Sequence, residues 1–222
     1  MFGLIDHLKI SHKFAVVAAL ALPMFGVPTA LLVRTDLAAI DMARSEAEGM
    51  PRAATVLRAI QLTQQHRALS AGMLGGATAM EAPRQAKQAE VEQALDKVAA
   101  DSAAWPQIAA QVADVRSRWK SLAAAVAGRS LDGRQSNAQH TALVSEELDA
   151  LGLVVDAARL SMDPEPAIHH AADAVLQALP RLGETLGRMR AQGTTLLQQR
   201  EATPPERAQL ASLADSARMR RA

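Results

Sequence analysis

Residues 108–126, IAAQVADVRSRWKSLAAAV, carry the apolar pattern that decides the fold. Their apolar positions alternate steps of four and three along the chain: Ile108, Val112, Val115, Trp119, Leu122 and Val126. On a helix this spacing puts all of these side chains on one face, as in the seam of a coiled coil. Such a face must be covered by other helices. The stretch therefore predicts one member of a helical bundle whose neighbours cross at roughly 20°.

Two later stretches repeat this rhythm. The first has apolar positions at Val144, Leu148, Leu151, Val155, Ala158 and Met162, and the second at Ile168, Ala172, Val175, Leu179, Leu182, Leu186 and Met189. Pro and Gly punctuate the chain between such stretches, with a possible interruption at Gly49–Pro51 and a kink or restart at Trp105–Pro106. We expect helices over about 36–74, 83–128, 138–162, 166–200 and 203–222. The predicted fold class is all-α, an antiparallel up-down helical bundle.

The composition agrees with a helical fold and excludes several functions. Hydrophobic residues make up 49% of the 222 residues, aromatic residues only 2%, and Cys and Tyr are absent. Without Cys there is no disulfide scaffold, thiolate metal site or cysteine nucleophile. The 24 Lys and Arg nearly balance the 23 Asp and Glu, for a formal net charge of +1. A nucleic-acid partner is not expected, since such proteins carry a clear basic excess.

The segment 14–33, FAVVAALALPMFGVPTALLV, contains no charged residue. Its 20 residues would span roughly 30 Å as a helix, which is one hydrocarbon core. Pro23 and Pro28 are tolerated in membrane helices. The alternative is a cleaved signal peptide, but the apolar run is long for one and no clear A-x-A site follows. The sequence therefore predicts a transmembrane anchor, with the membrane as a partner.

Basic residues flank this segment on both sides, so their count does not fix its orientation: Lys9 and Lys13 precede it, and Arg34 and Arg44 follow. Three parts are expected, namely residues 1–13, the membrane helix 14–33 and a helical domain over 36–222. The last helical stretch, 203–222, stops in mid-pattern without a capping Gly or Pro. We expect from this that the chain is the N-terminal piece of a longer protein.

Polar residues interrupt the apolar seam of the predicted helix over 36–74. Gln64 and Arg67 occupy seam positions, and Ser70 follows nearby. A buried Arg needs an acidic partner, an anion or a path to solvent. Its planar guanidinium suits bidentate binding of nitrate, a carboxylate or phosphate. One hypothesis is an anion or small-acid site at Gln64, Arg67 and Ser70; the alternative is a polar layer that fixes the register, with a second seam through His66 facing the core.

Arg190 is the second candidate for a ligand contact. It continues a four-three pattern that includes Gly183 and Gly193, which would let a facing helix approach closely. The alternative is a solvated basic patch formed by Arg181, Arg188, Arg190 and Arg200. His140 falls near a helix start without nearby ligands, and no metal or cofactor is expected. No phosphate loop or Ser/His/Asp set is present, so the sequence does not predict an enzyme.

Three stretches resemble parts of known bacterial sensor proteins. LKISHKF (8–14), before the apolar run, resembles the N-terminal lead of bacterial chemoreceptors. QQHRALSAG (64–72) resembles the Q-x-E-R-G-x-S helix of nitrate- and nitrite-sensing periplasmic domains, with His66 in place of the usual Glu and Ala68 in place of the usual Gly. Residues 163–193, from DPEP to Gly193, resemble the second half of sensor regions in proteobacterial receptors.

The resemblance implies a periplasmic helical sensor in the bacterial inner membrane, with residues 1–13 in the cytoplasm. It implies a homodimer that binds a small anion between helices, with Arg67 and Arg190 as contacts, and transmits binding by shifting helices relative to the membrane. The output would be a methyl-accepting, kinase or cyclase module, most simply that of a chemoreceptor. The alternative is a membrane-anchored helical interaction or dimerisation protein with no small-molecule site.

Overall fold

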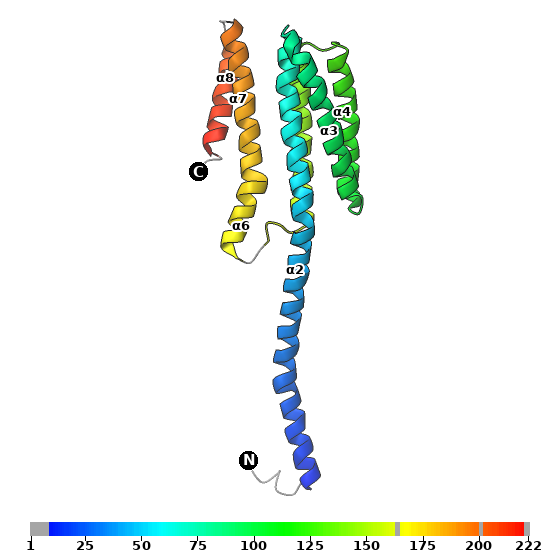
Figure 1. Ribbon diagram of the computed structural model, residues 1–222. Helices are drawn as coiled ribbons and strands as arrows, with labels where there is room; N and C mark the ends of the chain where they lie inside the picture. The colour runs from blue at the N-terminus through cyan, green and yellow to red at the C-terminus, as the bar shows by residue number, and fades with distance from the viewer. Residues whose placement is uncertain (1–8, 163–164, 200–201, 220–222) are drawn as a thin grey trace. The chain divides into compact units, whose positions relative to one another are not determined.

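The computed structural model describes residues 9–162, 165–199 and 202–219, and within them it confirms the all-α prediction. The elements in chain order are α2 (Ile10–Leu74), η1 (Thr78–Met80), α3 (Glu81–Ser102), α4 (Pro106–Ala127), α5 (Gly133–Ala157), α6 (Pro166–Asp173), η2 (Ala174–Ala178), α7 (Leu179–Gln199) and α8 (Pro204–Met219). Successive helices run up and down (Figure 1). Asp163, Arg200 and the chain ends at 1–8 and 220–222 lie outside the described residues.

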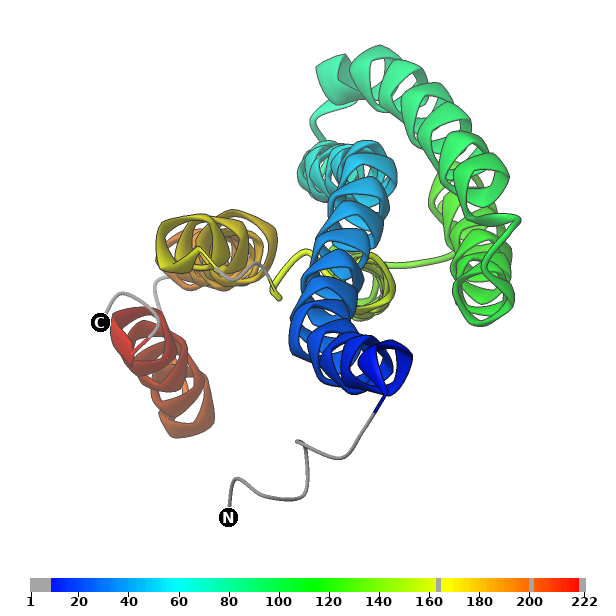
Figure 2. The same ribbon diagram turned by 90° about the horizontal axis from the view of Figure 1, so that it is seen from below.

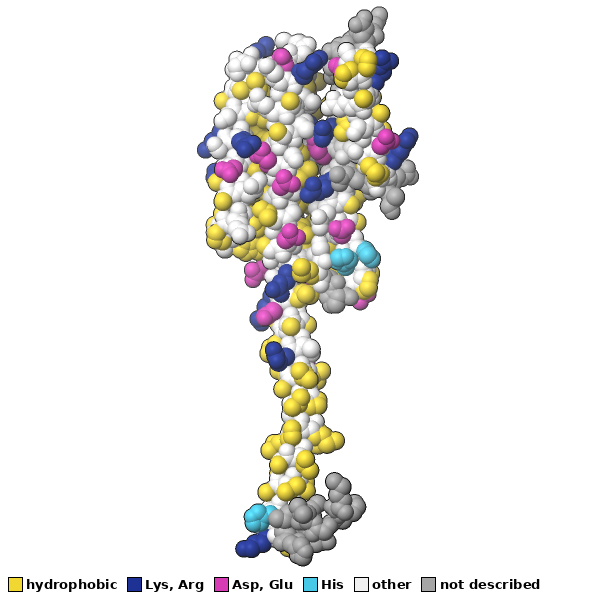
Figure 3. Space-filling model, turned by 180° about the vertical axis from the view of Figure 1, so that it is seen from behind, with side chains coloured by type: hydrophobic (Ala, Val, Ile, Leu, Met, Phe, Trp, Pro, Cys, Tyr) yellow, Lys and Arg dark blue, Asp and Glu magenta, His cyan; other side chains and the backbone are white. Residues whose placement is uncertain are grey.

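The chain divides into two compact units, Met1–Ser45 and Glu46–Ala222. The first contains the one helical stretch among the described residues that is long and apolar enough to cross a membrane, near the N-terminus of α2. Its large apolar side chains are exposed, including Phe14, Leu20 and Phe25. In Figure 3 hydrophobic side chains cover this segment, whereas basic and acidic side chains are interspersed over the helices of the second unit.

In the second unit α2 and α5 form the centre of the bundle. The hairpin of α3 and α4 lies on one side of them and α6 to α8 on the other, as Figures 1 and 2 show. One helix ends and a new one begins at Trp105–Pro106, so this position is a restart and not a kink. Pro106 is in the first turn of α4, which produces the hairpin. An Asp132–Gln135 capping box begins α5.

The core follows two of the three predicted seams. All six seam residues of α4 are at most 3% exposed, and the α5 seam is buried from Val144 to Ala158. Met162, at the end of that seam, is 63% exposed. The helix α2 is uninterrupted at Gly49–Pro51. A Cβ at Gly49 would lie 2.0 Å from that of Ala158, so glycine permits close packing there.

The third predicted seam is buried only in part: Ala172 packs into the core and Leu182 and Met189 are half-buried, but most of its large side chains are exposed. Its members Ile168, Val175, Leu179 and Leu186 are each at least half exposed. Leu176 and Glu184 face the protein instead. The π-helical turn η2 comes just before Pro180, which has no N–H to continue α-helical hydrogen bonding. The four-three spacing of this stretch therefore predicts its helical form but not its buried face, since four of its seven seam residues are exposed.

Candidate functional site

The polar stretch of α2 from Thr63 to Ser70 faces two neighbouring helices. Thr63, His66 and Ser70 have no exposed surface. Thr63 and His66 bond to side chains of α5. Arg67 is 6% exposed and reaches Glu184 on α7. Successive turns of α2 thus carry a hydrogen-bonded group facing α5 and an ion pair facing α7.

Arg67 and Glu184 form a bidentate ion pair. Nη1 donates to Oε1 at 2.7 Å and Nη2 donates to Oε2 at 3.0 Å. Both side chains are more than nine-tenths buried. This answers the prediction that a buried Arg at position 67 needs an acidic partner or an anion, since the partner in the structure is a carboxylate.

Three neighbours complete the surroundings of this pair. Gln64 Nε2 donates to Glu184 Oε2 at 3.0 Å, and Arg67 Nη1 donates a second bond to Thr141 Oγ1 at 3.0 Å. Gly187 lies one turn after Glu184, and a Cβ added there would come within 3.2 Å of Arg67 Nη2. The guanidinium therefore lies directly against the backbone of α7.

The Arg67–Glu184 pair lines a cleft of about 1790 Å³ between the α2–α5 pair and α7–α8. Gln64 and Arg190 line the same cleft, so the structure brings three of the four predicted ligand residues to one place. Arg190 is exposed, and Arg181 and Arg188 also line the wall. Ser70 does not reach the cleft, because it is buried with its Oγ 3.3 Å from His66 Nδ1.

Behind the cleft lies a second group, which we call the histidine cluster: Thr63, His66, Ser70, Ser136, His140 and Glu147. His140 Nδ1 is 2.7 Å from the carbonyl oxygen of Ser136 and must carry a proton to bond to it. The neutral His140 ring then accepts at Nε2 from His66 Nδ1, at 2.9 Å. His66 Nε2 is left as a buried acceptor with no hydrogen-bond partner among the described residues.

Burial keeps both rings of the histidine cluster uncharged. It is the main cause that lowers the pKa of His66 to about 3, with further contributions from His140 and Arg84. Burial likewise lowers the pKa of His140 to about 4, although its bond to the Ser136 carbonyl opposes this and Arg67 adds to it. The partner of His140 lies 74 positions away in the chain, so the residues around His140 in the sequence do not reveal this contact.

Glu147 is the acidic member of the histidine cluster. Its Oε1 accepts from Thr63 Oγ1 at 2.7 Å, and its Oε2 has no partner in the described part of the chain. Burial raises the pKa of Glu147 to about 8; the Thr63 bond opposes this and the nearby carboxylates of Glu184 and Glu146 add to it. The carboxyl group of Glu147 is therefore protonated at neutral pH, whereas the carboxylate of Glu184 is paired with the guanidinium of Arg67.

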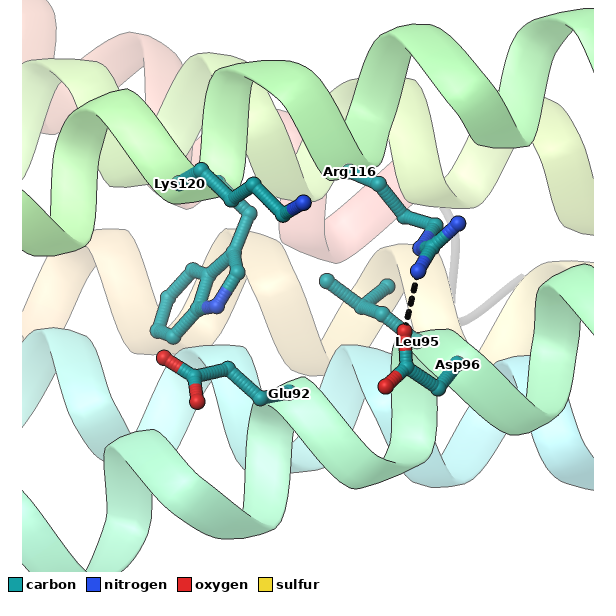
Figure 4. Close-up of a pocket in the computed structure, with 6 residues that line it drawn as sticks. Glu92, Leu95, Asp96, Arg116 and Lys120 are labelled. Carbon is teal, nitrogen blue, oxygen red and sulfur yellow. Dashed lines mark hydrogen bonds and ion pairs between the residues drawn. The ribbon is translucent and has the colours of Figure 1, made fainter.

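A smaller hollow of about 290 Å³ lies between α3 and α4. Figure 4 shows its charged walls, where Asp96 pairs with Arg116, and Glu92 and Lys120 also line the hollow. The mixture of two carboxylates and two cations gives no net preference for an anion or a cation. No group of His, Asp and Glu within 9–162, 165–199 and 202–219 is arranged to hold a metal ion.

Sequence reasoning found Gln64, Arg67 and Arg190 but missed the groups around them. Glu184 lies within the stretch 168–189, between two positions of its predicted apolar seam. Glu147 directly precedes the buried Leu148. An acidic residue beside a seam is a weak signal by itself. The need of a buried Arg67 for an acidic partner was a stronger signal, but it does not say which carboxylate on which helix supplies it.

Comparison with known proteins identifies one family. Residues 58–222, which are 165 of the 222 residues, match the model of a protein family described as nitrate and nitrite sensing. The match includes Arg67, Arg190 and the whole histidine cluster. Searches of curated proteins and of solved structures returned no significant match.

Proposed function

The chain belongs to the nitrate and nitrite sensing family, and we propose that it is the ligand-sensing region of a bacterial membrane receptor for a small anion such as nitrate. The observation that carries this proposal is the convergence of Arg67, Arg190 and Gln64 on one cleft. Guanidinium and amide groups are the donors that a planar oxyanion requires. The histidine cluster, to which Ser70 belongs, holds the inner face of α2 in register against α5, behind the cleft.

The membrane arrangement is part of the same proposal. Residues 14–33 are the membrane helix, 1–13 lie in the cytoplasm, and 36–222 form the sensor domain in the periplasm. The apolar N-terminal stretch of α2 supports the anchor, since its side chains are exposed. A chemoreceptor-type output would read the position of the helices that continue toward the membrane.

An exposed apolar stripe supports a homodimer. Ile168, Val175, Leu179 and Leu186 are spaced by seven, four and seven residues along α6, η2 and α7. Each is between 50% and 56% exposed. Heptad spacing of this kind is typical of a helix that pairs with a second helix. The same stripe is what favours the alternative, a membrane-anchored interaction protein without a small-molecule ligand.

Calorimetric titration of sodium nitrate into the full chain, purified in detergent, tests anion binding. We expect a saturable heat and a thermal shift; at a hundred times the dissociation constant, stabilisation is about 2.7 kcal/mol. Arg67→Lys keeps a cation beside Glu184 but loses the fork, so affinity should fall at least tenfold. Arg190→Ala should also weaken binding, with helical content unchanged.

Arg58→Ala is the matched control. Arg58 lies on the same helix and forms a surface ion pair with Glu90, so its removal should leave nitrate affinity unchanged. Titrations with nitrite, formate, acetate and chloride at equal ionic strength define the anion class. A chain that melts cooperatively but takes up none of these anions would reject the sensor proposal in favour of the interaction protein.

A further inference from the structure

We propose that Glu184 is an internal competitor for the anion: its carboxylate fills the fork of Arg67, and an incoming planar anion binds by displacing it and releasing α7. This rests on the proposed function and adds to it the residue that sets anion affinity and couples binding to helix movement. No residue has to be brought in from elsewhere, because every group involved already lies in the cleft.

The geometry of the pair is that of a bound oxyanion. Two oxygens of one planar group meet two nitrogens of the Arg67 fork at 2.7 and 3.0 Å. The amide of Gln64 supplies a third donor to one of these oxygens, at 3.0 Å. Nitrate, nitrite and small carboxylates present the same planar O–X–O edge, so they can take all three hydrogen bonds in place of Glu184.

The pair is also the principal buried contact of α7. Among the side chains of α7 that the structure describes, those of residues 179–193 and 196, only Glu184 and Thr185 are buried. Thr185 bonds to the carbonyl of Arg181 on its own helix. Leu179 and Leu186 are half exposed. Polar bonds to Arg67 and Gln64 therefore hold α7 against α2, and an anion that takes over these bonds loosens it.

The exchange is feasible because one anion replaces another. Arg67 keeps a negatively charged partner throughout, so no isolated buried cation is produced. Glu184 can turn toward the open cleft, where its charge is hydrated and Arg181, Arg188 and Arg190 line the wall. The apparent dissociation constant is then the intrinsic one divided by the fraction of molecules in which the fork is open.

Nitrate titration of Glu184→Gln in the full chain tests this competition. A neutral amide holds the fork less strongly than a carboxylate, so the variant should bind nitrate at least tenfold more tightly than the wild type. Glu146→Gln is the matched control: its carboxylate pairs with Arg118 outside the cleft, and its loss should leave affinity unchanged. Glu184→Ala gives a second reading, because formate should restore its thermal stability by filling the emptied fork.

The release of α7 has a separate readout. The chain has no Cys, so Gln65→Cys and Gly183→Cys introduce two unique spin-label sites on α2 and α7. Gly183 has open space where a Cβ would be added. With labelled chains diluted by unlabelled ones, nitrate should lengthen or broaden the distance distribution, and Glu184→Gln should produce a similar change without nitrate.

The outcomes separate this inference from the proposed function. Tighter binding by Glu184→Gln together with the change in distance supports both. Wild-type binding that Glu184→Gln leaves unchanged or weakens overturns the competition and leaves the anion sensor standing. Binding by the variant alone supports the competition and rejects nitrate as the ligand of the wild type. If neither protein binds any planar anion, both proposals fail; an unchanged distance on nitrate binding overturns the release of α7.

Discussion

His66 and Arg67 are neighbours in the sequence, yet they belong to opposite kinds of polar surroundings. His66, its partner His140, and Glu147 of the same cluster are buried as uncharged groups, which the direction of each pKa shift reflects. Arg67 is buried as a charged group beside the carboxylate of Glu184. One helix turn thus holds a neutral network toward α5 and an ion pair toward α7.

The difference indicates which side can respond to a ligand. In the histidine cluster the bond between His66 and His140 depends on which nitrogen of each ring carries the proton, and losing either partner leaves a buried polar group unsatisfied. In the Arg67–Glu184 pair the partner of the cation can be exchanged for another anion of similar shape. The α2–α5 contact is therefore suited to remain fixed while the α2–α7 contact changes.

The largest expected effect comes from breaking the ion pair. Arg67→Ala leaves the buried Glu184 carboxylate without its cation and should lower the free energy of unfolding by about 3–5 kcal/mol. The double variant Arg67→Met/Glu184→Met removes both charges and should recover most of that loss. Urea denaturation followed by circular dichroism measures both. Equal stability of Arg67→Ala and the wild type would show that α7 does not depend on this pair.

Glu147→Gln changes the other side of the comparison. The folded-state pKa of about 8 lies above the ordinary 4.5, so the contribution of Glu147 to stability is fully present below pH 4.5 and is lost as pH rises toward 8. At about 1.4 kcal/mol per pH unit above pH 4.5, keeping the buried carboxyl protonated lowers the free energy of unfolding by about 3 kcal/mol at pH 7. Gln keeps the Thr63 bond without this cost, so it should stabilise by up to that amount at pH 7 and by little at pH 4.5.

The control is Glu146→Gln, one position earlier on α5 and outside the cluster. It should change stability by less than about 1 kcal/mol at either pH, as expected for a surface ion pair. Destabilisation by Glu147→Gln at pH 7 would mean that Glu147 is ionised there and bound to a cation, which contradicts the neutral cluster.

The sequence was sufficient for the helices, and it singled out some residues of the cleft but not their partners. Apolar spacing identified the buried faces of α4 and α5, because their seams face the core of the same chain. The same spacing in 168–189 predicted a buried face that is mostly exposed, because four of its seven residues face outward and a carboxylate turns inward at 184. Arg67 stood out as a charge on a seam, and the second seam pointed His66 toward the core. The partner of His66 is 74 residues away, however, and nothing in the sequence pairs it with His140.

Acid should weaken the histidine cluster, and Glu147 should partly mask the effect. The pKa values of His66 and His140 are lowered from 6.5, so their stability is fully present above pH 6.5 and is lost as pH falls toward 4. Between pH 6 and 5 the two rings should lower the free energy of unfolding by about 2–3 kcal/mol per pH unit as the pH falls. Over the same range Glu147 should raise it by about 1 kcal/mol per pH unit. The acid slope of Glu147→Gln should therefore be steeper than that of the wild type by about 1 kcal/mol per pH unit.

Urea midpoints collected at half-unit steps of pH resolve this difference in slope. His170→Gln, which changes an exposed ring on α6, serves as the control and should have the wild-type slope. Parallel slopes in the wild type and Glu147→Gln would show that Glu147 titrates alike in the folded and unfolded chain.

The smallest expected effect distinguishes two glycines of α7. Ala usually stabilises an exposed helix position by about 0.5–1 kcal/mol relative to Gly, and Gly193 has open space for the added Cβ. At Gly187 the Cβ would lie 3.2 Å from Arg67 Nη2, so the guanidinium must shift and its bidentate geometry with Glu184 weakens. Gly193→Ala should therefore raise the urea midpoint, while Gly187→Ala should leave it unchanged or lower it. Equal gains in both would show that the guanidinium moves aside freely, and a fork that moves freely cannot hold α7 in place.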